Sequence, residues 1–169
     1  MLPLDTPRLR FREMSIADLD AMATLLGDPD VMRFYPTPKT RPQAAEWIGW
    51  NADNYVRHGH GLWIIERTFG EFVGDCGLTW QEVNGGLRLE VGYHVLPRWQ
   101  GQGLATEAAA ACRDHARYQL GASELVAIIH PDNSASRRVA EKIGMRHIED
   151  DRRGKEAVRN VMGMALVPR

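Results

Sequence analysis

The chain has little cysteine and no long hydrophobic run. Its 169 residues contain two cysteines, Cys76 and Cys112, which lie far apart and form no CxxC pair. This spacing argues against a disulfide framework or a cysteine-rich zinc site, and it predicts two reduced thiols in the core. No apolar stretch approaches the roughly 18 residues of a membrane span, and segment 1–10 lacks the apolar core of a signal peptide. We therefore expect no membrane segment and a cytoplasmic location.

An excess of charge of either sign is also missing. The chain has 21 lysine and arginine residues and 22 aspartate and glutamate residues, for a net charge of −1 at pH 7. Proteins that bind nucleic acid usually carry a basic surface, so this balance argues against nucleic acid as a partner. His58 and His60 have no third ligand near them in the sequence, so we expect no metal site. The length predicts a single domain over residues 1–169 that folds without a metal or disulfide.

The apolar residues change period repeatedly, from the alternation typical of strands to the three-to-four-residue spacing typical of helices. Thr40 followed by Gln43 forms a capping box, and the links 68–71 and 84–86 predict two hairpins. The expected strands are 8–13, 62–67, 72–80, 87–95, 124–129 and one on either side of 152–155; the expected helices are 16–26, 41–57, 104–120 and 134–143. This order predicts an α/β (α+β) fold, with a mixed and mostly antiparallel sheet of about seven strands and helices on both faces.

One segment carries the clearest chemical signal. After the strand that ends near Val95, Gly101 and Gly103 stand one residue apart in a short loop, and an alanine-rich helix follows. Glycines let consecutive N–H groups turn toward one ligand, and a helix amino terminus adds unpaired donors and partial positive charge. The segment therefore predicts an anion cradle that suits a pyrophosphate.

Two common nucleotide motifs do not fit this loop. Thr106 stands where G-x-G-x-x-G requires a third glycine, and no lysine occurs where a P-loop requires one. The pattern that fits is R/Q-x-x-G-x-G/A, with Arg98, Gly101 and Gly103. This is the acetyl-coenzyme A signature of the GNAT N-acetyltransferases, which the sequence resembles.

The resemblance extends along almost the whole chain and points to the Rim-type branch, whose enzymes acetylate the amino termini of ribosomal proteins. The matching segments are Thr6–Arg12, Asp28–Arg33, Gly92-Tyr93, Gly101–Glu107, Asn133–Ser136 and Glu141–Met145. The resemblance implies a single-domain GNAT fold, acetyl-CoA as co-substrate, and direct attack on its thioester by a primary amine. The amine would belong to a protein N-terminus or a small molecule, and a homodimer is implied as well. Two alternatives stay open: a non-catalytic acyl-CoA-binding module of the same fold, and an unrelated nucleotide binder.

The resemblance also implies roles for individual residues. The backbone N–H near Val95 is expected to hold the oxyanion, and Asn133 is expected to bind the pantetheine arm or to cap the helix that follows it. The cradle would be lined, mostly through backbone N–H groups, by Arg98, Gln100, Gly101, Gln102, Gly103, Leu104 and Ala105. The candidates for the 3′-phosphate of the coenzyme, or else plain helix surface, are Arg137, Arg138 and Lys142.

Several residues compete for the role of general base. Glu90 lies on the strand that enters the site, where some relatives have a glutamate that acts through water. Asp150 and Asp151, near the end of a later strand, are the next candidates. His94 has a suitable pKa, but its alternation with Tyr93 can turn it away from the site.

The general acid and the acceptor side are less strongly marked. Helix 134–143 lacks the tyrosine with which many family members protonate the leaving thiolate, so Ser136 is the candidate donor. By resemblance, the first two helices and the loop between them form the wall that faces the acceptor. Residues 33–36 in that loop are therefore expected to touch the substrate, whereas Trp47 and Trp50 fit either that wall or the core.

Overall fold

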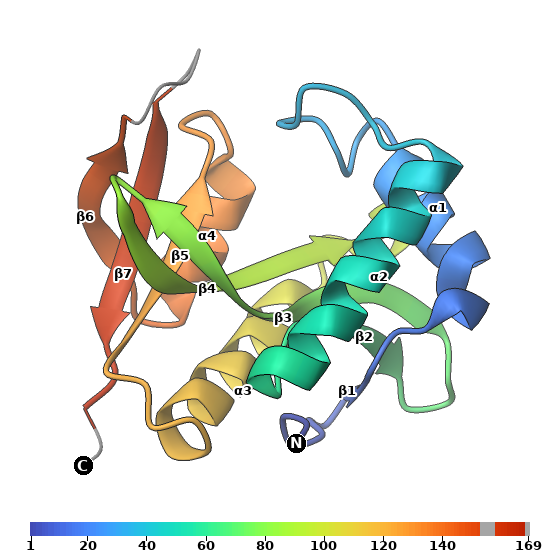
Figure 1. The fold of residues 1–169 in the computed structure, drawn as a ribbon, viewed down its shortest axis with the longest axis horizontal. Helices are drawn as coiled ribbons and strands as arrows, with labels where there is room; N and C mark the ends of the chain where they lie inside the picture. Colours follow the sequence, from blue (N-terminus) through green and yellow to red (C-terminus); the bar gives the residue numbers. More distant parts are fainter. Residues whose placement is uncertain (153–157, 168–169) are drawn as a thin grey trace.

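The computed structural model describes residues 1–152 and 158–167, which form a mixed seven-stranded sheet with helices on both faces (Figure 1). The strands are β1 (Leu9–Arg12), β2 (Leu62–Arg67), β3 (Phe72–Val83), β4 (Gly86–Val95), β5 (Glu124–Ile129), β6 (Arg146–Asp151) and β7 (Arg159–Ala165). The helices are α1 (Leu19–Gly27), α2 (Arg41–His58), α3 (Leu104–Tyr118) and α4 (Ser134–Lys142), with two 3-10 turns, η1 (Ile16–Asp18) and η2 (Pro97–Trp99). The fold class expected from the sequence is confirmed. Of the link predicted at 152–155, residues 153–155 lie outside the described residues.

The described strands have the order β1-β2-β3-β4-β5-β7-β6, and every neighbouring pair is antiparallel except β4 and β5. These two strands are parallel and pair where Glu90 lies opposite Val126. Beyond that position they diverge toward their carboxyl ends, as Figure 1 shows. We call this divergence, after Glu90 on β4 and Val126 on β5, the β4–β5 fork.

Each face of the sheet is covered by a pair of helices. Along β2, Leu62 and Ile64 pack in one cluster with α1 and α2, whereas Trp63 and Ile65 belong to the cluster that includes α3 and α4. This alternation follows from the two-residue period of a strand.

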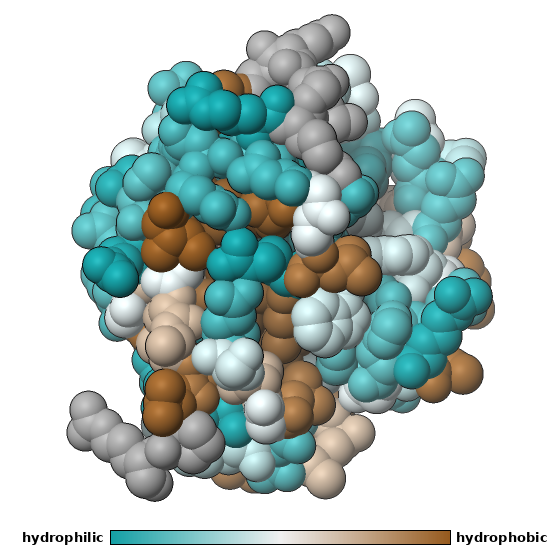
Figure 2. Space-filling model, turned by 60° about the vertical axis from the view of Figure 1, so that its left-hand side comes forward, coloured by the Kyte–Doolittle hydropathy of each residue, from teal (hydrophilic) through white to brown (hydrophobic). Residues whose placement is uncertain are grey.

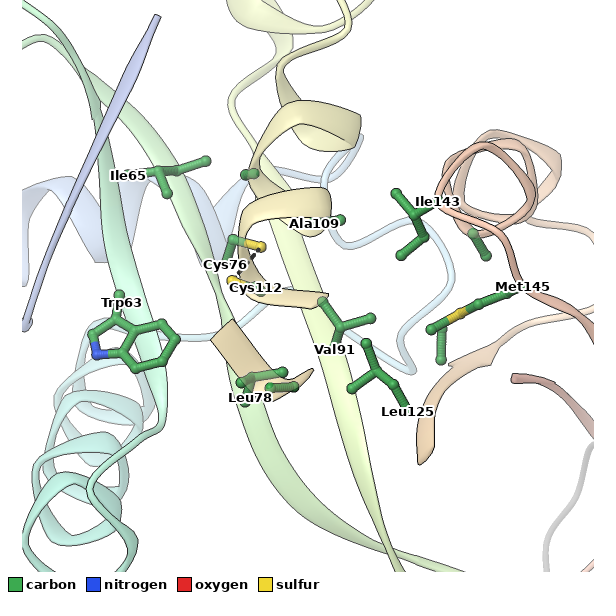
Figure 3. Packing of buried hydrophobic residues seen from close by; sticks show 14 of the residues in the cluster. Trp63, Ile65, Cys76, Leu78, Val91, Ala109, Cys112, Leu125, Ile143 and Met145 are labelled. Atoms are coloured by element: carbon green, nitrogen blue, oxygen red, sulfur yellow. Dashed lines mark hydrogen bonds between the residues drawn. The ribbon is translucent and has the colours of Figure 1, made fainter. Parts of the chain in front are cut away.

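Small side chains let α3 lie close to the sheet. Figure 3 shows Cys112 and Ala109 of α3 beside Cys76 of β3, and the two sulfur atoms are 3.7 Å apart. Both cysteines are free and buried, as their spacing predicts, and burial raises the pKa of the Cys76 thiol.

Local sequence signals explain where the first helices begin and end. The capping box of Thr40 and Gln43 opens α2, and Gly59, with φ 75°, ends it. The expected helix over 16–26 differs, because its first turn is the 3-10 turn η1. There Ser15 and Asp18 form a second capping box, in which the Asp18 carboxylate accepts the Ser15 N–H at 2.8 Å.

The hairpin between β3 and β4 is longer than the sequence predicts. Asn84 and Gly85, with φ 47° and 91°, form a two-residue turn, so pairing continues to Val83 opposite Gly86. This turn fixes the register of the two strands, on which the site described below depends.

The side of the molecule that carries β6 and β7 is mostly hydrophilic, and hydrophobic side chains show there in small areas (Figure 2). Among the helices of the described residues, none is both long enough and apolar enough to cross a bilayer. Within the same residues, no three His, Cys, Asp or Glu side chains group as they would around a metal ion. His60 is instead buried, with its Nδ1 2.7 Å from the carbonyl oxygen of Leu78.

Candidate active site

The β4–β5 fork begins where the Glu90 side chain enters the sheet. Its Oε2 accepts a hydrogen bond from the backbone N–H of Ile128 on β5, at 2.8 Å. Hydrogen-bonding directions alternate along an antiparallel strand. Because the N–H of Leu96 donates to Val73 on β3, the N–H of Val95 points to the other side, into the fork. The Val95 side chain is buried in the core, so Val95 reaches the fork only through its backbone.

The glycine loop lies between β4 and α3. Gly101 has φ 76° and Gly103 has φ 80°, which is the left-handed region that favours glycine. Gly103 is the N-cap of α3, and no described side chain caps the helix there, so its first N–H groups are available to an anion. Leu104 is buried in the core and Ala105 packs against it, so these two residues can meet an anion only through backbone N–H groups. The loop has the geometry that a pyrophosphate cradle requires.

The polar side chains of the loop are partly engaged with the protein itself. The guanidinium of Arg98 is exposed and lies 5.0 Å from the ring centroid of Trp99. The Gln100 amide donates to the carbonyl of Val95 at 2.9 Å, and the Gln102 amide donates to the carbonyl of Arg98 at 3.3 Å. These bonds hold the loop against the end of β4, next to the fork.

Two segments from distant parts of the chain meet beside the glycine loop. Glu107, in the first turn of α3, accepts hydrogen bonds from the Thr6 hydroxyl at 2.6 Å and from Nε of Arg8 at 2.8 Å. Arg8 also donates from Nη1 to the carbonyl of Gln102 in the loop, at 2.8 Å. Burial opposes the ionisation of Glu107, but these hydrogen bonds outweigh it and lower the pKa of the carboxyl. The sequence marks both segments and contains no signal that they touch.

Helix α4 carries the predicted pantetheine contacts. Asn133 caps it, with Oδ1 accepting the N–H of Ser136 at 3.1 Å, so the capping role is present. Ser136 is half-buried, and its carbonyl accepts a hydrogen bond from the Tyr93 hydroxyl of β4 at 2.9 Å, which ties β4 to α4. The three candidates for the 3′-phosphate are exposed: Arg137, Arg138 and Lys142.

The Glu90 side chain is half-buried and lies beside a residue that has no side chain. Its Oε1 lies 4.0 Å from the point that a Cβ would occupy at Gly92, two residues further along β4. Because Gly92 has no side chain, it leaves room beside Oε1 for a small group. Burial raises the pKa of Glu90 to about 7, although the Ile128 N–H and the charges of Arg159 and His94 act against the rise. Such a carboxyl is suited to general-base work near neutral pH.

The two candidate aspartates are already held by basic partners. Asp151 is buried and forms an ion pair with Arg159, with 2.6 Å between Oδ2 and Nη2. Its Oδ1 also accepts the N–H of Asn84, in the turn between β3 and β4. Asp150 lies 2.7 Å from Nε2 of His147. Through Asn84 they meet the amino end of β4, whereas Val95 and the glycine loop lie at its carboxyl end.

His94 is turned toward the acceptor side rather than away from the site. Its Nδ1 lies 2.7 Å from Oδ1 of Asp75, whose side chain is fully buried, and its Nε2 lies 2.7 Å from the Tyr35 hydroxyl. The indole N–H of Trp47 donates to the other oxygen of Asp75 at 3.1 Å. Burial lowers the pKa of His94, but Tyr35 and Asp75 outweigh burial and raise it to about 10. Asp75 is not among the site residues predicted from the sequence. The turn at Asn84 was the signal that could have identified it, because that turn sets the register that places Asp75 opposite His94.

The loop between α1 and α2 reaches both arms of the fork. The Phe34 ring lies 5.0 Å from the ring of His130, which follows β5, and the Tyr35 ring lies 5.7 Å from that of His94 on β4. Arg33 lies over the Phe34 ring at 5.7 Å. The loop thus forms a wall over the fork, in the region where the sequence predicts substrate contacts.

Comparison with known proteins identifies the family to which this site belongs. The sequence profile of the acetyltransferase (GNAT) domain matches residues 8–146. The chain belongs to the GNAT acetyltransferase family. It is an enzyme of that family, and acetyl-CoA, the co-substrate that the resemblance implies, is its acetyl donor.

Individual relatives agree with this family. The protein YkkB of Bacillus subtilis (strain 168), itself uncharacterised, is 40% identical over 160 residues, which cover 92% of this chain and 91% of YkkB. An uncharacterised N-acetyltransferase of the same organism, YnaD, is 28% identical over 145 residues, covering 85% of this chain and 82% of YnaD. The crystal structure of an acetyltransferase from Agrobacterium tumefaciens str. C58 has a TM-score of 0.84 at 27% identity, covering 97% of this GNAT chain and 94% of that one.

The Rim-type branch receives support only at the level of the fold. The structure of RimL, the ribosomal L7/L12 α-N-protein acetyltransferase, in complex with coenzyme A has a TM-score of 0.78 and 15% identity. It covers 96% of this chain and 97% of RimL. An identity this low shows a shared GNAT fold and does not carry the acceptor of RimL over to this enzyme.

Proposed function

We propose that residues 1–169 form one N-acetyltransferase domain that transfers the acetyl group of acetyl-CoA to a primary amine by direct attack on the thioester. The observation that carries the proposal is the β4–β5 fork, where the N–H of Val95 points inward beside a left-handed glycine loop at the start of α3. In this arrangement the coenzyme's pyrophosphate lies on the Gly101 and Gly103 loop, and its acetyl end enters the fork.

The chemical step follows from what the fork contains. The thioester oxygen accepts the N–H of Val95, which stabilises the negative charge of the tetrahedral intermediate. The acceptor amine lies over Gly92, beside Oε1 of Glu90, and Glu90 takes its proton directly or through water. The nitrogen then bonds to the acetyl carbon, the C–S bond breaks, and coenzyme A leaves as a thiolate that takes up a proton.

The acceptor is a protein N-terminus, as in the Rim-type branch, or a small amine. The sequence segments shared with that branch support the first. In either case Gly92 contributes no side chain, and the nearest atoms to the position of its missing Cβ are Cδ2 of Leu62 at 3.5 Å and Oε1 of Glu90 at 4.0 Å, which fits a small primary amine. A homodimer is proposed on the resemblance alone, and a cytoplasmic location on the two reduced cysteines. Asp151 is the second candidate for the base, although Arg159 holds its carboxylate.

The binding half of the proposal is tested by thermal unfolding with four ligands. Acetyl-CoA and CoA are expected to raise the melting temperature, and NADH and ATP to do so far less, because the loop lacks the third glycine and the lysine of their motifs. At 100 times the dissociation constant the stabilisation is about 2.7 kcal/mol, a shift of roughly 5–10 °C. Equal shifts from all four ligands would count against an acetyl-CoA site.

The catalytic half is tested by release of free coenzyme A thiol from acetyl-CoA in the presence of peptides with free N-termini, amino acids and alkylamines. Release that depends on one class of amine identifies the acceptor. Tight binding of acetyl-CoA without thiol release from any of them would favour the alternative, a non-catalytic acyl-CoA-binding module.

Ser136 is proposed to hydrogen-bond the departing sulfur from the first turn of α4. Its effect should be modest, because a thiol of pKa about 8.5 leaves tolerably well without help. Ser136→Ala is therefore expected to lower kcat roughly tenfold, about 1.4 kcal/mol in barrier, with the KM for the amine unchanged. A matched substitution, Ser134→Ala, changes a more exposed serine of the same turn and should leave kcat as it is. Equal rates for both variants and the wild type would remove Ser136 from the mechanism.

A further inference from the structure

An unbroken chain of hydrogen bonds runs from the core of the sheet to the loop between α1 and α2, residues 28–40, which we call the acceptor loop. It begins at the fully buried carboxylate of Asp75, passes through both ring nitrogens of His94, and ends at the hydroxyl of Tyr35, with 2.7 Å at each step. Trp47 fixes the far end, because its indole N–H donates to Asp75 and its ring meets the His94 ring edge-on at 5.7 Å. Burying such polar groups costs free energy that an apolar core would avoid, so this chain points to a function.

The chain ends beside the reaction centre. His94 immediately precedes Val95, whose N–H points into the fork. On the acceptor loop, Phe34 rests against His130 on the β5 side while Tyr35 meets His94 on the β4 side, so the loop spans the fork. Tyr35 is 41% exposed, which leaves part of its side chain open to a substrate.

Glu90 and His94 project from the same face of β4, since side chains four residues apart on a strand share a face. Gly92 lies between them and contributes no side chain. The acceptor amine therefore has a carboxylate on one side and the histidine–tyrosine pair on the other. This is the arrangement in which one group removes a proton and the other supplies one.

We propose that the Tyr35 hydroxyl is the proton donor to the departing coenzyme A thiolate, with His94 and Asp75 as positioning residues behind it. The inference rests on the proposed function and adds a catalytic residue to it. As the C–S bond breaks, the sulfur takes the Tyr35 proton and the tyrosine oxygen takes the Nε2 proton of His94. The imidazole is left neutral, with its Nδ1–H still donating to Asp75, and regains a proton from solvent. Helix α4 has no tyrosine, and this hydroxyl comes from the opposite side of the fork.

The contacts of His94 agree with these roles. Tyr35 and Asp75 raise the pKa of His94 to about 10, against the effect of burial. The Asp75 carboxylate, 2.7 Å from Nδ1, favours an imidazolium that donates at both nitrogens. The charged and titratable groups that face it are Asp75 of β3, Tyr35 of the acceptor loop and Glu90 of its own strand. On the α2 side it meets the Trp47 ring, over which Lys39 places an ammonium group at 5.3 Å.

Tyr35→Phe tests the proposal, because it keeps the ring against His94 and removes only the hydroxyl. With a peptide amine of pKa about 8 as acceptor, kcat is expected to fall 10- to 100-fold while the KM for acetyl-CoA stays unchanged. In the wild type kcat should decline above about pH 10, as His94 loses its proton, and this decline should be absent in Tyr35→Phe. His94→Gln, which can still bridge its two partners but cannot titrate, should lack the same decline.

The matched control is Tyr118→Phe at the end of α3, where the tyrosine is exposed and lies by Arg117. It should match the wild type in kcat and in pH profile. A Tyr35→Phe enzyme with wild-type kcat and an unchanged alkaline decline overturns this inference while the proposed function stands. A wild type that acetylates no amine overturns both.

Discussion

Gly101→Val is expected to abolish acetyl-CoA binding while the fold is retained. Gly101 has φ 76°, a region that a β-branched residue enters at a cost of about 1–3 kcal/mol, well within the stability of an ordinary domain. A Cβ at this position meets no described atom within 4 Å, so the isolated protein has room for it. In the proposed complex the pyrophosphate occupies that room. Calorimetric titration should show CoA affinity reduced at least 100-fold, about 2.8 kcal/mol.

A matched variant separates loss of the cradle from backbone strain. Gly121, just beyond the end of α3, has φ 63°, and its Cβ would likewise meet no described atom within 4 Å. Gly121→Val therefore introduces the same type of strain away from the loop, and it should bind CoA as the wild type does. If both valine variants bind CoA equally, whether tightly or weakly, the glycine loop is not the pyrophosphate site. Gly103→Val should behave as Gly101→Val does.

Much of this fold could be predicted because its signals are local. The Thr40 and Gln43 capping box and the left-handed Gly59 define α2 within a few residues, and the alternation along β2 separates its two faces. The glycine loop was predictable for the same reason, since glycine is the residue type that readily adopts the positive φ found at Gly101 and Gly103.

The contacts that the sequence did not predict are those between distant segments. Glu107 and Arg8 meet only because β1 is placed beside the start of α3 by the sheet order. The pairing of Asp75 with His94 lies between these two cases. It joins two strands, but a two-residue turn at Asn84 sets their register, so a sequence reader who recognises that turn can predict the pair. Alternation alone places His94 on the face opposite Tyr93, and only the packing of the acceptor loop shows that this face belongs to the site.

Glu90→Gln is expected to remove the acidic limb of the pH–rate profile. The amide oxygen of glutamine can still accept the N–H of Ile128, so the fork keeps its geometry, but the side chain no longer takes up a proton. In the wild type the rate should rise as pH increases through about 7, since Glu90 acts as a base only when ionised, and its pKa is raised to about 7 by burial. Loss of a general base typically lowers the rate 100-fold or more.

The acceptor for this measurement should be an alkylamine with a pKa of about 10.4, so that its own titration lies well above the limb that belongs to Glu90. Asp151→Asn is the comparison, because it removes the carboxylate that Arg159 already holds and should leave the limb near pH 7 in place. If the acidic limb survives in Glu90→Gln and disappears in Asp151→Asn, the general base is Asp151, at the end of β6, and not Glu90. If neither variant changes the profile, the amine reaches the thioester already neutral, and the rate follows the fraction of free amine with no enzyme group visible.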